Sequence, residues 1–263
     1  MGLAIVVSGG NALANGTSFR PPAIASQPAA SLLGWWYLGG NLAQSVKNWA
    51  NLNAPATPIG APTFASNYVS TDGGYLTGGA AKSFSSNVPD QTNLTLFAVA
   101  RSNGPFNGGF SAPALLNAYN NGPAATGFYG CNLSIGGSAG ATAAIPLSGS
   151  SYNNAGASGG ANAQLPAQDV TTFKAFASRL TSAGVPKIFN LTAGTSATGP
   201  TLPGVTLPGV GPIEIGSSPH RVSGGPADIA LAAIYSAALS DNDVTAVVYP
   251  FIKTAMAALG ITV

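Results

Sequence analysis

The sequence predicts an all-β fold in which two antiparallel sheets stack face to face, and three observations support this prediction. Short apolar or alternating segments recur at regular spacing, with glycine, proline and asparagine turns between them. Residues 94–101 and 229–235 are apolar on both faces, as expected of central strands covered on both sides. The 263 residues are enough for one sandwich whose core needs no disulfide.

The first half of the chain supplies the earliest strand candidates. Residues 31–40 (SLLGWWYLGG) predict an aromatic strand that ends in two glycines. Residues 41–53 place Leu42, Val46 and Trp49 at loose helical spacing, which predicts a turn of helix. Residues 60–79 predict two strands joined by a hairpin turn, Thr71-Asp72-Gly73-Gly74.

The middle of the chain, residues 102–168, is rich in loops, with short strands predicted in GFYGCNLSIGG and AAIPL. Residues 169–180 (DVTTFKAFASRL) fit either a helix or a strand. The Ser182-Ala183-Gly184 turn and the following KIFNLTAG favour a hairpin, so we expect strands. Residues 194–212 predict an extended surface loop, and PIEIG predicts a strand.

The last strand, ending at Tyr235, leads into a capped helix. Ser240 is the expected N-cap and Asp243 follows three residues later, which is the spacing of a capping box. Acids at this end also suit the helix dipole. We therefore interpret Asp241 and Asp243 as helix-starting residues rather than catalysts, and expect Pro250 to bend or restart the helix.

The composition excludes several classes of function. Only 6% of the residues are charged, against roughly 25% in ordinary domains, and no run of Lys or Arg could neutralise several phosphates, so we expect no nucleic-acid partner. A monomer with so few charges has little to keep it soluble, which indicates that other copies or partners cover part of its surface. The single cysteine, Cys131, excludes an internal disulfide, fits a reducing cytoplasm and is expected to be a buried, inert thiol.

The N-terminal residues have a different character from the rest of the chain. Residues 1–30 combine one short apolar stretch with a Gly/Asn/Ser loop and three prolines, and have little to fold around. They lack the basic region and the apolar length of about 7 residues that a secretion signal needs, and no stretch reaches the roughly 18 apolar residues of a membrane span. We expect an anchoring arm over residues 1–30 and one domain over residues 31–263.

Several motifs, in their order along the chain, resemble laminin-G-like domains of the concanavalin A-like lectin/glucanase superfamily. The motifs are LLGWWYLGGN, SVKNWANLN, IGAPTF, KIFNLTAG, PIEIGSS and a final strand followed by Ala-Leu-Ser-Asp and a short helix. The resemblance covers roughly residues 31–250 and implies an antiparallel jelly-roll β-sandwich. The arm resembles the start of phage tail or virion proteins that attach such a domain to a particle.

The resemblance also implies where catalysis would be, and the sequence departs from it. Glycosidases of the superfamily use a Glu-x-Asp-x-x-Glu strand, whose two carboxyl groups lie about 5 Å apart. This chain has one glutamate, Glu214, with no other acid near it in sequence. His220, the only histidine, lies in a loop without a nucleophile motif, although Asp228 could be its acidic partner. We expect no catalytic residue.

Metal sites are not expected either. Zinc needs several His or Cys ligands, and the chain has one of each. Laminin-G-like domains often hold calcium, so the resemblance makes Asp72 and Asp90 the candidate ligands, but the chain contains no Asp-x-Asp-x-Asp loop. The prediction is a protein without metal or cofactor.

Two loops have the composition of a sugar site, with an aromatic ring for stacking and amides for hydroxyl groups. The alternative is that asparagine and glycine serve only the turns. The three tryptophans are expected to fill the core or an interface. The candidate ligand-binding residues are Tyr119, Asn120, Asn121, Tyr152, Asn153 and Asn154.

These observations favour a structural virion component, a phage tail or capsid appendage assembled in the host cytoplasm. It would form a homo-oligomer, such as a trimer, and contact other virion proteins. Its lectin-like domain would attach to a host-surface glycan or receptor. The alternatives are a stand-alone carbohydrate-binding protein and a polysaccharide-degrading glycoside hydrolase.

Overall fold

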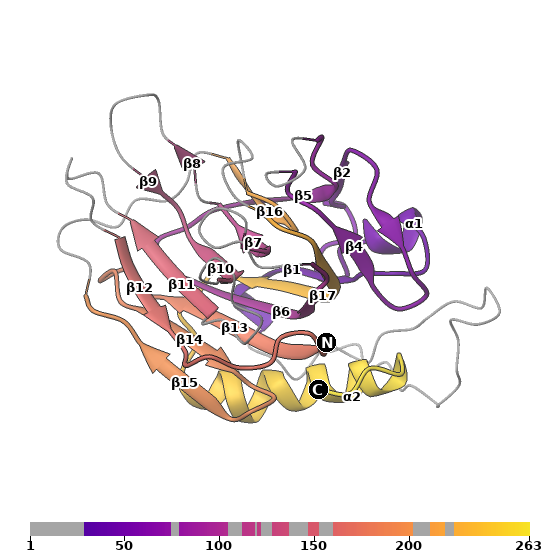
Figure 1. The fold of residues 1–263 in the computed structure, drawn as a ribbon. Helices are drawn as coiled ribbons and strands as arrows, with labels where there is room; N and C mark the ends of the chain where they lie inside the picture. The colour runs from indigo at the N-terminus through magenta and orange to yellow at the C-terminus, as the bar shows by residue number, and fades with distance from the viewer. Residues whose placement is uncertain are drawn as a thin grey trace.

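A computed structural model of the chain shows the sandwich that the sequence predicts (Figure 1). It describes residues 29–74, 79–104, 112–118, 120–121, 128–136, 147–152, 160–201, 211–218 and 224–263. The predicted arm lies outside these residues, apart from the start of a 3₁₀ turn over Ala29–Ser31 (η2), so the division at residue 30 stays a prediction.

Sheet A contains eight antiparallel strands in the order β15-β14-β13-β6-β17-β4-β3, and β1 also pairs with β17. The two segments predicted to be central, β6 and β17, are neighbours in the middle of this sheet. The bounds are β1 (Leu32–Tyr37), β3 (Thr63–Phe64), β4 (Val69–Thr71), β6 (Leu94–Ser102), β13 (Lys174–Leu180), β14 (Pro186–Asn190), β15 (Thr195–Thr198) and β17 (Ala227–Tyr235).

Sheet B contains seven antiparallel strands in the order β12-β11-β10-β7-β16-β5-β2. A separate two-stranded hairpin, β8 (Asn120–Asn121) with β9 (Phe128–Tyr129), adjoins it through contact between β9 and β11. The bounds are β2 (Thr57–Ile59), β5 (Ser83–Pro89), β7 (Ala114–Asn117), β10 (Asn132–Ile135), β11 (Leu147–Tyr152), β12 (Gly160–Gln164) and β16 (Pro212–Ile215).

The main core lies between the two sheets, as expected for a sandwich. Alternate residues of each strand point inward, so apolar rows from both sheets meet and exclude water. Trp36 and Leu96 enter it from sheet A, and Phe84, Leu116 and Ile215 enter it from sheet B; all five are fully buried.

A second core lies on the other side of sheet A, under the C-terminal helix. Figure 1 shows α2 (Tyr249–Ala258) along this outer face, away from β5, β7 and β16. Phe97 and Tyr235 from the sheet and Ile252 and Met256 from the helix are buried together there. This second core explains why β6 and β17 are apolar on both faces, and why Trp35, next to Trp36, is also fully buried.

The predicted capping box is present. The backbone N–H of Asp243 donates to Ser240 Oγ (3.1 Å), and the N–H of Ser240 donates to Asp243 Oδ2 (3.2 Å). The first turns, Asp243–Val248 (η5), are π-helical, and the Tyr249 N–H reaches back to the Val244 carbonyl. Pro250 cannot donate a hydrogen bond, which fits a change of helix type at this point. No helix in the described part of the chain is long and apolar enough to cross a membrane.

The predicted turn of helix is present at Leu42–Ser45 (α1), but Trp49 lies beyond it, beside the buried Asn48 side chain, which accepts the N–H groups of Ala50 and Asn51. Two other local predictions need correction. β3 and β4 already form a hairpin, which turns at residues 65–68, and Asp72 of the predicted turn forms an isolated antiparallel bridge with Lys82. The predicted loop after Gly194 contains β15, because the turn that Asn190 Oδ1 stabilises returns the chain along β14.

Candidate functional site

The outer face of sheet B carries a row of polar residues that are direct partners across neighbouring strands. Glu214 of β16 lies opposite Ser85 of β5 on one side and Asn117 of β7 on the other. Asn117 lies opposite Asn132 of β10, and the register continues through Ser150 of β11 to Asn162 of β12. We call the five residues Ser85, Glu214, Asn117, Asn132 and Asn162 the polar row.

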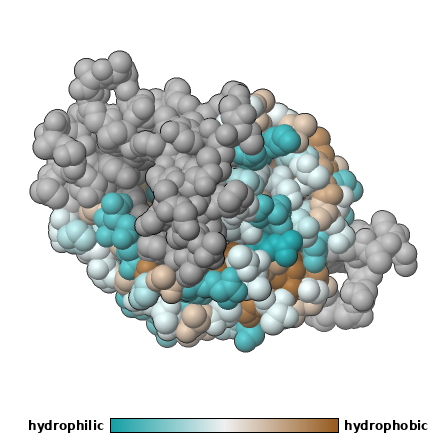
Figure 2. All heavy atoms as spheres, viewed as in Figure 1, coloured by the Kyte–Doolittle hydropathy of each residue, from teal (hydrophilic) through white to brown (hydrophobic). Residues whose placement is uncertain are grey.

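The polar row faces outward because the residues next to it face the main core. Phe84, Ile215, Leu116 and Leu133 form the neighbouring register, and all four are fully buried between the sheets. Successive residues of a strand point to opposite faces, so the row must lie on the opposite, outer side. In the part of Figure 2 that is not grey, hydrophilic and hydrophobic residues are mixed over the surface.

Hydrogen bonds hold the members of the row in place. Asn117 Nδ2 donates to Asn132 Oδ1 (3.2 Å), and the Ser85 hydroxyl donates to the amide oxygen of Asn87 (3.2 Å). Asn162 is exposed and Asn132 is half-buried, so their amide groups are accessible, whereas Asn117 is fully buried. The arrangement supplies hydroxyl and amide groups as donors and acceptors.

Glu214 is the one carboxylate of the polar row. It accepts a hydrogen bond from Ser217, whose hydroxyl is also within 2.7 Å of the hydroxyl of Ser83. Its cross-strand partners, Ser85 and Asn117, are not acids. None of these neighbours supplies the second carboxyl group that the glycosidase mechanism uses.

The structure brings the backbones of both predicted sugar-binding loops to the end of sheet B where β11 finishes. Asn120 and Asn121 form β8, and Tyr152 ends β11 opposite Gly160. Because β9 pairs with β8 and contacts β11, the two segments lie at the same end of the fold. The prediction for their side chains stays untested, and the remaining predicted residues, Tyr119, Asn153 and Asn154, lie outside the described residues.

Asp228 has a structural role. Its carboxylate is fully buried on the outer face of sheet A, 2.8 Å from the Arg101 guanidinium, and accepts hydrogen bonds from Ser70 (2.6 Å) and Asn103 (2.9 Å). Asp228 is therefore a buried, ion-paired residue of sheet A. His220, its suggested catalytic partner, lies outside the described residues.

The candidate calcium ligands do not form a common site. Asp72 Oδ1 accepts the N–H of Gly74 (2.8 Å) in a turn, whereas Asp90 is buried and accepts the N–H of Cys131 (3.1 Å). Cys131 is buried, as predicted, and burial together with the adjacent Asp90 raises the pKa of its thiol. Among the described residues, no three His, Cys, Asp or Glu side chains lie close enough to share a metal ion.

The ligand-binding residues that the sequence predicts lie in loops, and the polar row is not among them. The row lies within strands, at the polar positions of short alternating segments: CNLSI holds Asn132, IEI holds Glu214 and ANAQL holds Asn162. The alternation that predicts each strand also marks its outer residues. No single segment predicts which strands are neighbours in the sheet. The sequence therefore does not predict that these residues lie side by side.

Comparison with known proteins identifies the fold. No protein-family model and no curated protein matches the sequence. Among solved structures, the binding domain of Paraclostridial Mosquitocidal Protein 1 is similar (TM-score 0.57, 10% identity), with 84% of this chain and 52% of that chain covered. The botulinum neurotoxin serotype C1 binding domain is also similar (TM-score 0.57, 11% identity; 85% and 52% covered).

A third similar structure is a mutant of Trypanosoma rangeli sialidase that displays trans-sialidase activity (TM-score 0.54, 14% identity), with 85% of this chain and 33% of that chain covered. The chain thus spans about half of each toxin domain and a third of the sialidase. At this level of identity the similarity establishes the fold alone. The chain is an all-β, antiparallel jelly-roll β-sandwich with a short C-terminal helix.

Proposed function

We propose that this protein is a non-enzymatic carbohydrate-binding module and that the polar row on sheet B contacts the glycan. The observation that carries the proposal is the row itself, with amide, hydroxyl and carboxylate groups in register on strands β5, β16, β7, β10 and β12.

The spacing of the row suits an extended sugar chain. Neighbouring strands lie about 4.8 Å apart, so polar side chains recur at about that interval across the sheet. Sugar hydroxyl groups both donate and accept hydrogen bonds, and asparagine amides offer both functions. Stacking groups would come from the loops at the end of the sheet, where Tyr152 ends β11.

The proposal of binding without hydrolysis rests on Glu214. A retaining glycosidase needs a second carboxyl group about 5 Å from the first, and an inverting one needs it within about 10 Å. Ser85 and Asn117 flank Glu214, and Ser217 is its hydrogen-bonding partner. A screen for polysaccharide degradation tests whether the protein hydrolyses glycans. Degradation by the wild type that is lost in Glu214→Gln would show that it is a glycoside hydrolase.

The similar structures give this proposal support of a general kind. Two of them are named as binding domains, and a third is named as a sialidase that displays trans-sialidase activity. The same sandwich therefore occurs in proteins whose names refer to binding or to sugar chemistry.

A glycan array with the full chain tests the proposal. Asn132→Asp keeps the oxygen that accepts from Asn117 and removes the amide donor, so we expect binding to a neutral glycan to fall about tenfold or more. Asn242→Asp makes the same chemical change at an exposed position beside the C-terminal helix and should leave binding unchanged. Equal binding by both variants, or no binding by the folded wild-type chain, would contradict the proposal.

The finer proposal is that the module belongs to a phage virion, assembled in the host cytoplasm, with residues 1–30 as the anchoring arm and other virion proteins or copies of itself as partners. Its support is the low proportion of charged residues, 6%. We expect the full chain to be a homo-oligomer at native concentration, and deletion of residues 1–30 to give a monomer that still binds glycan. A monomeric full-length chain would contradict this proposal.

A further inference from the structure

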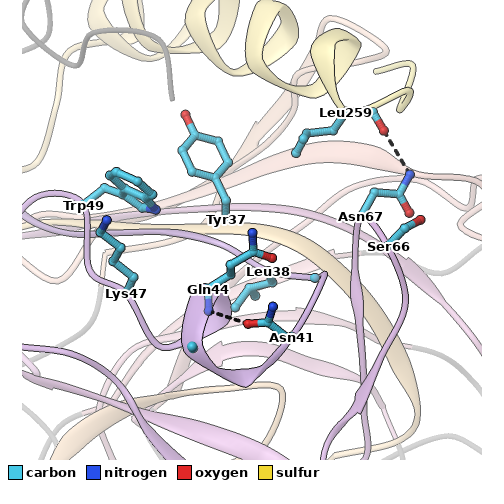
Figure 3. A pocket seen from close by; sticks show the side chains of 11 residues that line it. Tyr37, Leu38, Asn41, Gln44, Lys47, Trp49, Ser66, Asn67 and Leu259 are labelled. Atoms are coloured by element: carbon cyan, nitrogen blue, oxygen red, sulfur yellow. Dashed lines mark hydrogen bonds between the residues drawn. The ribbon is translucent and has the colours of Figure 1, made fainter. Parts of the chain in front are cut away.

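A pocket of about 270 Å³ lies over the outer face of sheet A, on the opposite side of the sandwich from the polar row (Figure 3). Tyr37, the last residue of β1, forms part of its base. The loop from α1 to Trp49 forms one wall, the β3–β4 turn with Asn67 forms another, and Leu259 closes it after α2. None of these residues was predicted as part of a ligand site.

The lining combines aromatic surface with amides and a single charge. Tyr37, Trp49 and Leu259 supply the apolar part, and the side chains of Asn41, Gln44 and Asn67 supply polar groups. Figure 3 shows Trp49 and Tyr37 on the same side of the pocket, with Gln44 between Lys47 and Asn41. Aromatic rings beside a few placed polar groups are typical of a small-ligand site.

Lys47 is the charged residue of the pocket, and no carboxylate neutralises it. All seven Asp and Glu residues lie in the described part of the chain, and none lines the pocket. Two carboxylates in the described part of the chain form ion pairs, and both are bound to other cations. Asp228 pairs with Arg101, and Asp241 pairs with Arg179 and Lys187. The Lys47 ammonium instead lies 3.8 Å from the centre of the Trp49 ring. An unneutralised ammonium beside aromatic surface favours an anionic ligand with an apolar face.

Buried hydrogen bonds hold the walls in place before any ligand binds. The fully buried Asn48 accepts the N–H of Trp35 (3.1 Å), and the Trp49 N–H donates to the Trp35 carbonyl (2.8 Å), which fixes the loop of Lys47 and Trp49 on β1. Asn67 Nδ2 donates to the Leu259 carbonyl (3.0 Å) and joins the second wall to the helix. A preformed pocket loses little conformational freedom on binding.

We propose that this pocket binds one carboxylate-bearing sugar, a hexuronic or nonulosonic acid residue of a glycan. The sugar ring lies against Trp49, its carboxylate pairs with the Lys47 ammonium on its flexible stem, and its hydroxyl groups bond to the amide of Gln44. This site goes beyond the proposed function, because it lies on the other sheet and selects an acidic sugar.

Tryptophan fluorescence tests the proposal directly. Trp35 and Trp36 are fully buried and Trp49 is partly exposed, so quenching by neutral acrylamide reports on Trp49. We expect D-glucuronic acid or N-acetylneuraminic acid to protect the fluorescence at concentrations about tenfold or more below those of glucose. Trp49→Phe should remove the protectable signal, and comparing the two acids shows which class of acidic sugar is bound.

Charge removal provides the decisive variant. Lys47→Gln should raise the dissociation constant for the acidic sugar about tenfold or more, to the range of glucose, whereas Lys253→Gln, at an exposed lysine of α2, should change nothing. Equal protection by glucose, unaltered affinity in Lys47→Gln, or no protection by either acid would overturn the proposal. Asn132→Asp should leave this signal intact, so failure of the glycan array and failure of this experiment are separate results.

Discussion

The outer faces of the two sheets have opposite chemistry, although both sheets contribute to the same core. On sheet A the outward residues are apolar, such as Phe97, Leu231 and Tyr235, and the C-terminal helix covers them. On sheet B the outward residues are polar, such as Glu214 and Asn132, and lie in register across the strands. The outer face of sheet A therefore serves stability, whereas that of sheet B carries hydrogen-bonding side chains.

The energetics of the two faces differ for the same reason. Burying a large apolar side chain stabilises a fold by roughly 1.5–3 kcal/mol, so each residue under the helix contributes to folding. A half-exposed amide keeps its hydrogen bonds to water when unfolded, so its net contribution is small. Substitutions on the outer face of sheet A should therefore change the free energy of unfolding, whereas substitutions in the polar row should change it little.

At one end of sheet A, an ion pair and two aromatic rings cover the outer face in place of the helix. There the Arg101 guanidinium lies 4.8 Å from the Phe173 ring and 5.2 Å from the Tyr68 ring, above buried Asp228. The two rings are themselves 5.6 Å apart. An ion pair flanked by aromatic rings thus takes the place of apolar packing.

The largest expected effect comes from the helix side of the comparison. Ile252→Ala removes a fully buried side chain between α2 and sheet A and should lower the free energy of unfolding by about 3 kcal/mol. Thr254→Ala, on the exposed side of the same helix, should change it by less than about 0.5 kcal/mol. Urea denaturation measures both, and equal small effects would mean that the helix does not cover the sheet.

The ion pair at the end of sheet A should have the next largest effect. Asp228→Asn leaves Arg101 without its counter-charge and should cost about 2 kcal/mol, less than the 3–5 kcal/mol of a fully buried pair, because the Arg101 side chain is 33% exposed. Chemical denaturation in parallel with Asp169→Asn, at an exposed acid, provides the measurement. A loss no greater than that control would show that the aromatic rings alone close this end.

Much of this fold could be predicted from the sequence, because local patterns carry it. The alternation in β17 and β6, the capping box of Ser240 and Asp243, and the hairpin of β13 and β14 are all confirmed. Each depends on residues close together in the chain. The corrected elements depend on single side chains in the folded state, as with Asn190, whose side chain accepts the N–H of Ala193 in the turn before β15.

The candidate sites were less predictable because they are assembled from distant segments. Glu214 and Asn117 are neighbours only because β16 inserts between β7 and β5, an order that no local pattern specifies. The pocket is more remote still, since it joins Trp49 to Leu259 across nearly the whole chain. Composition could indicate that Trp49 lies in the core or at an interface, but not what lies opposite it.

The smallest expected effect concerns the attachment of the helix to sheet A. Asp241, at the start of the helix, binds Lys187 of β14 and Arg179 of β13, and Arg179 also donates to the Leu239 carbonyl (2.8 Å). The hydrogen bond from Lys187, with the charge of Arg179, lowers the pKa of Asp241. The side chain is 55% exposed, so these pairs should contribute at most about 1 kcal/mol.

The sign of the pH dependence follows from that lowered pKa. The stabilisation is fully present above the unfolded pKa of about 3.9 and disappears as the pH falls through the lower pKa of the folded state. The difference in unfolding free energy between the wild type and Asp241→Asn should therefore be constant near neutral pH, shrink below about pH 4, and decrease in high salt. For Asp169, whose pKa is lowered by hydrogen bonds from Thr171, the corresponding difference should be less sensitive to salt. A wild-type advantage at Asp241 that grows on acidification would mean that its carboxylate does not hold the helix to sheet A.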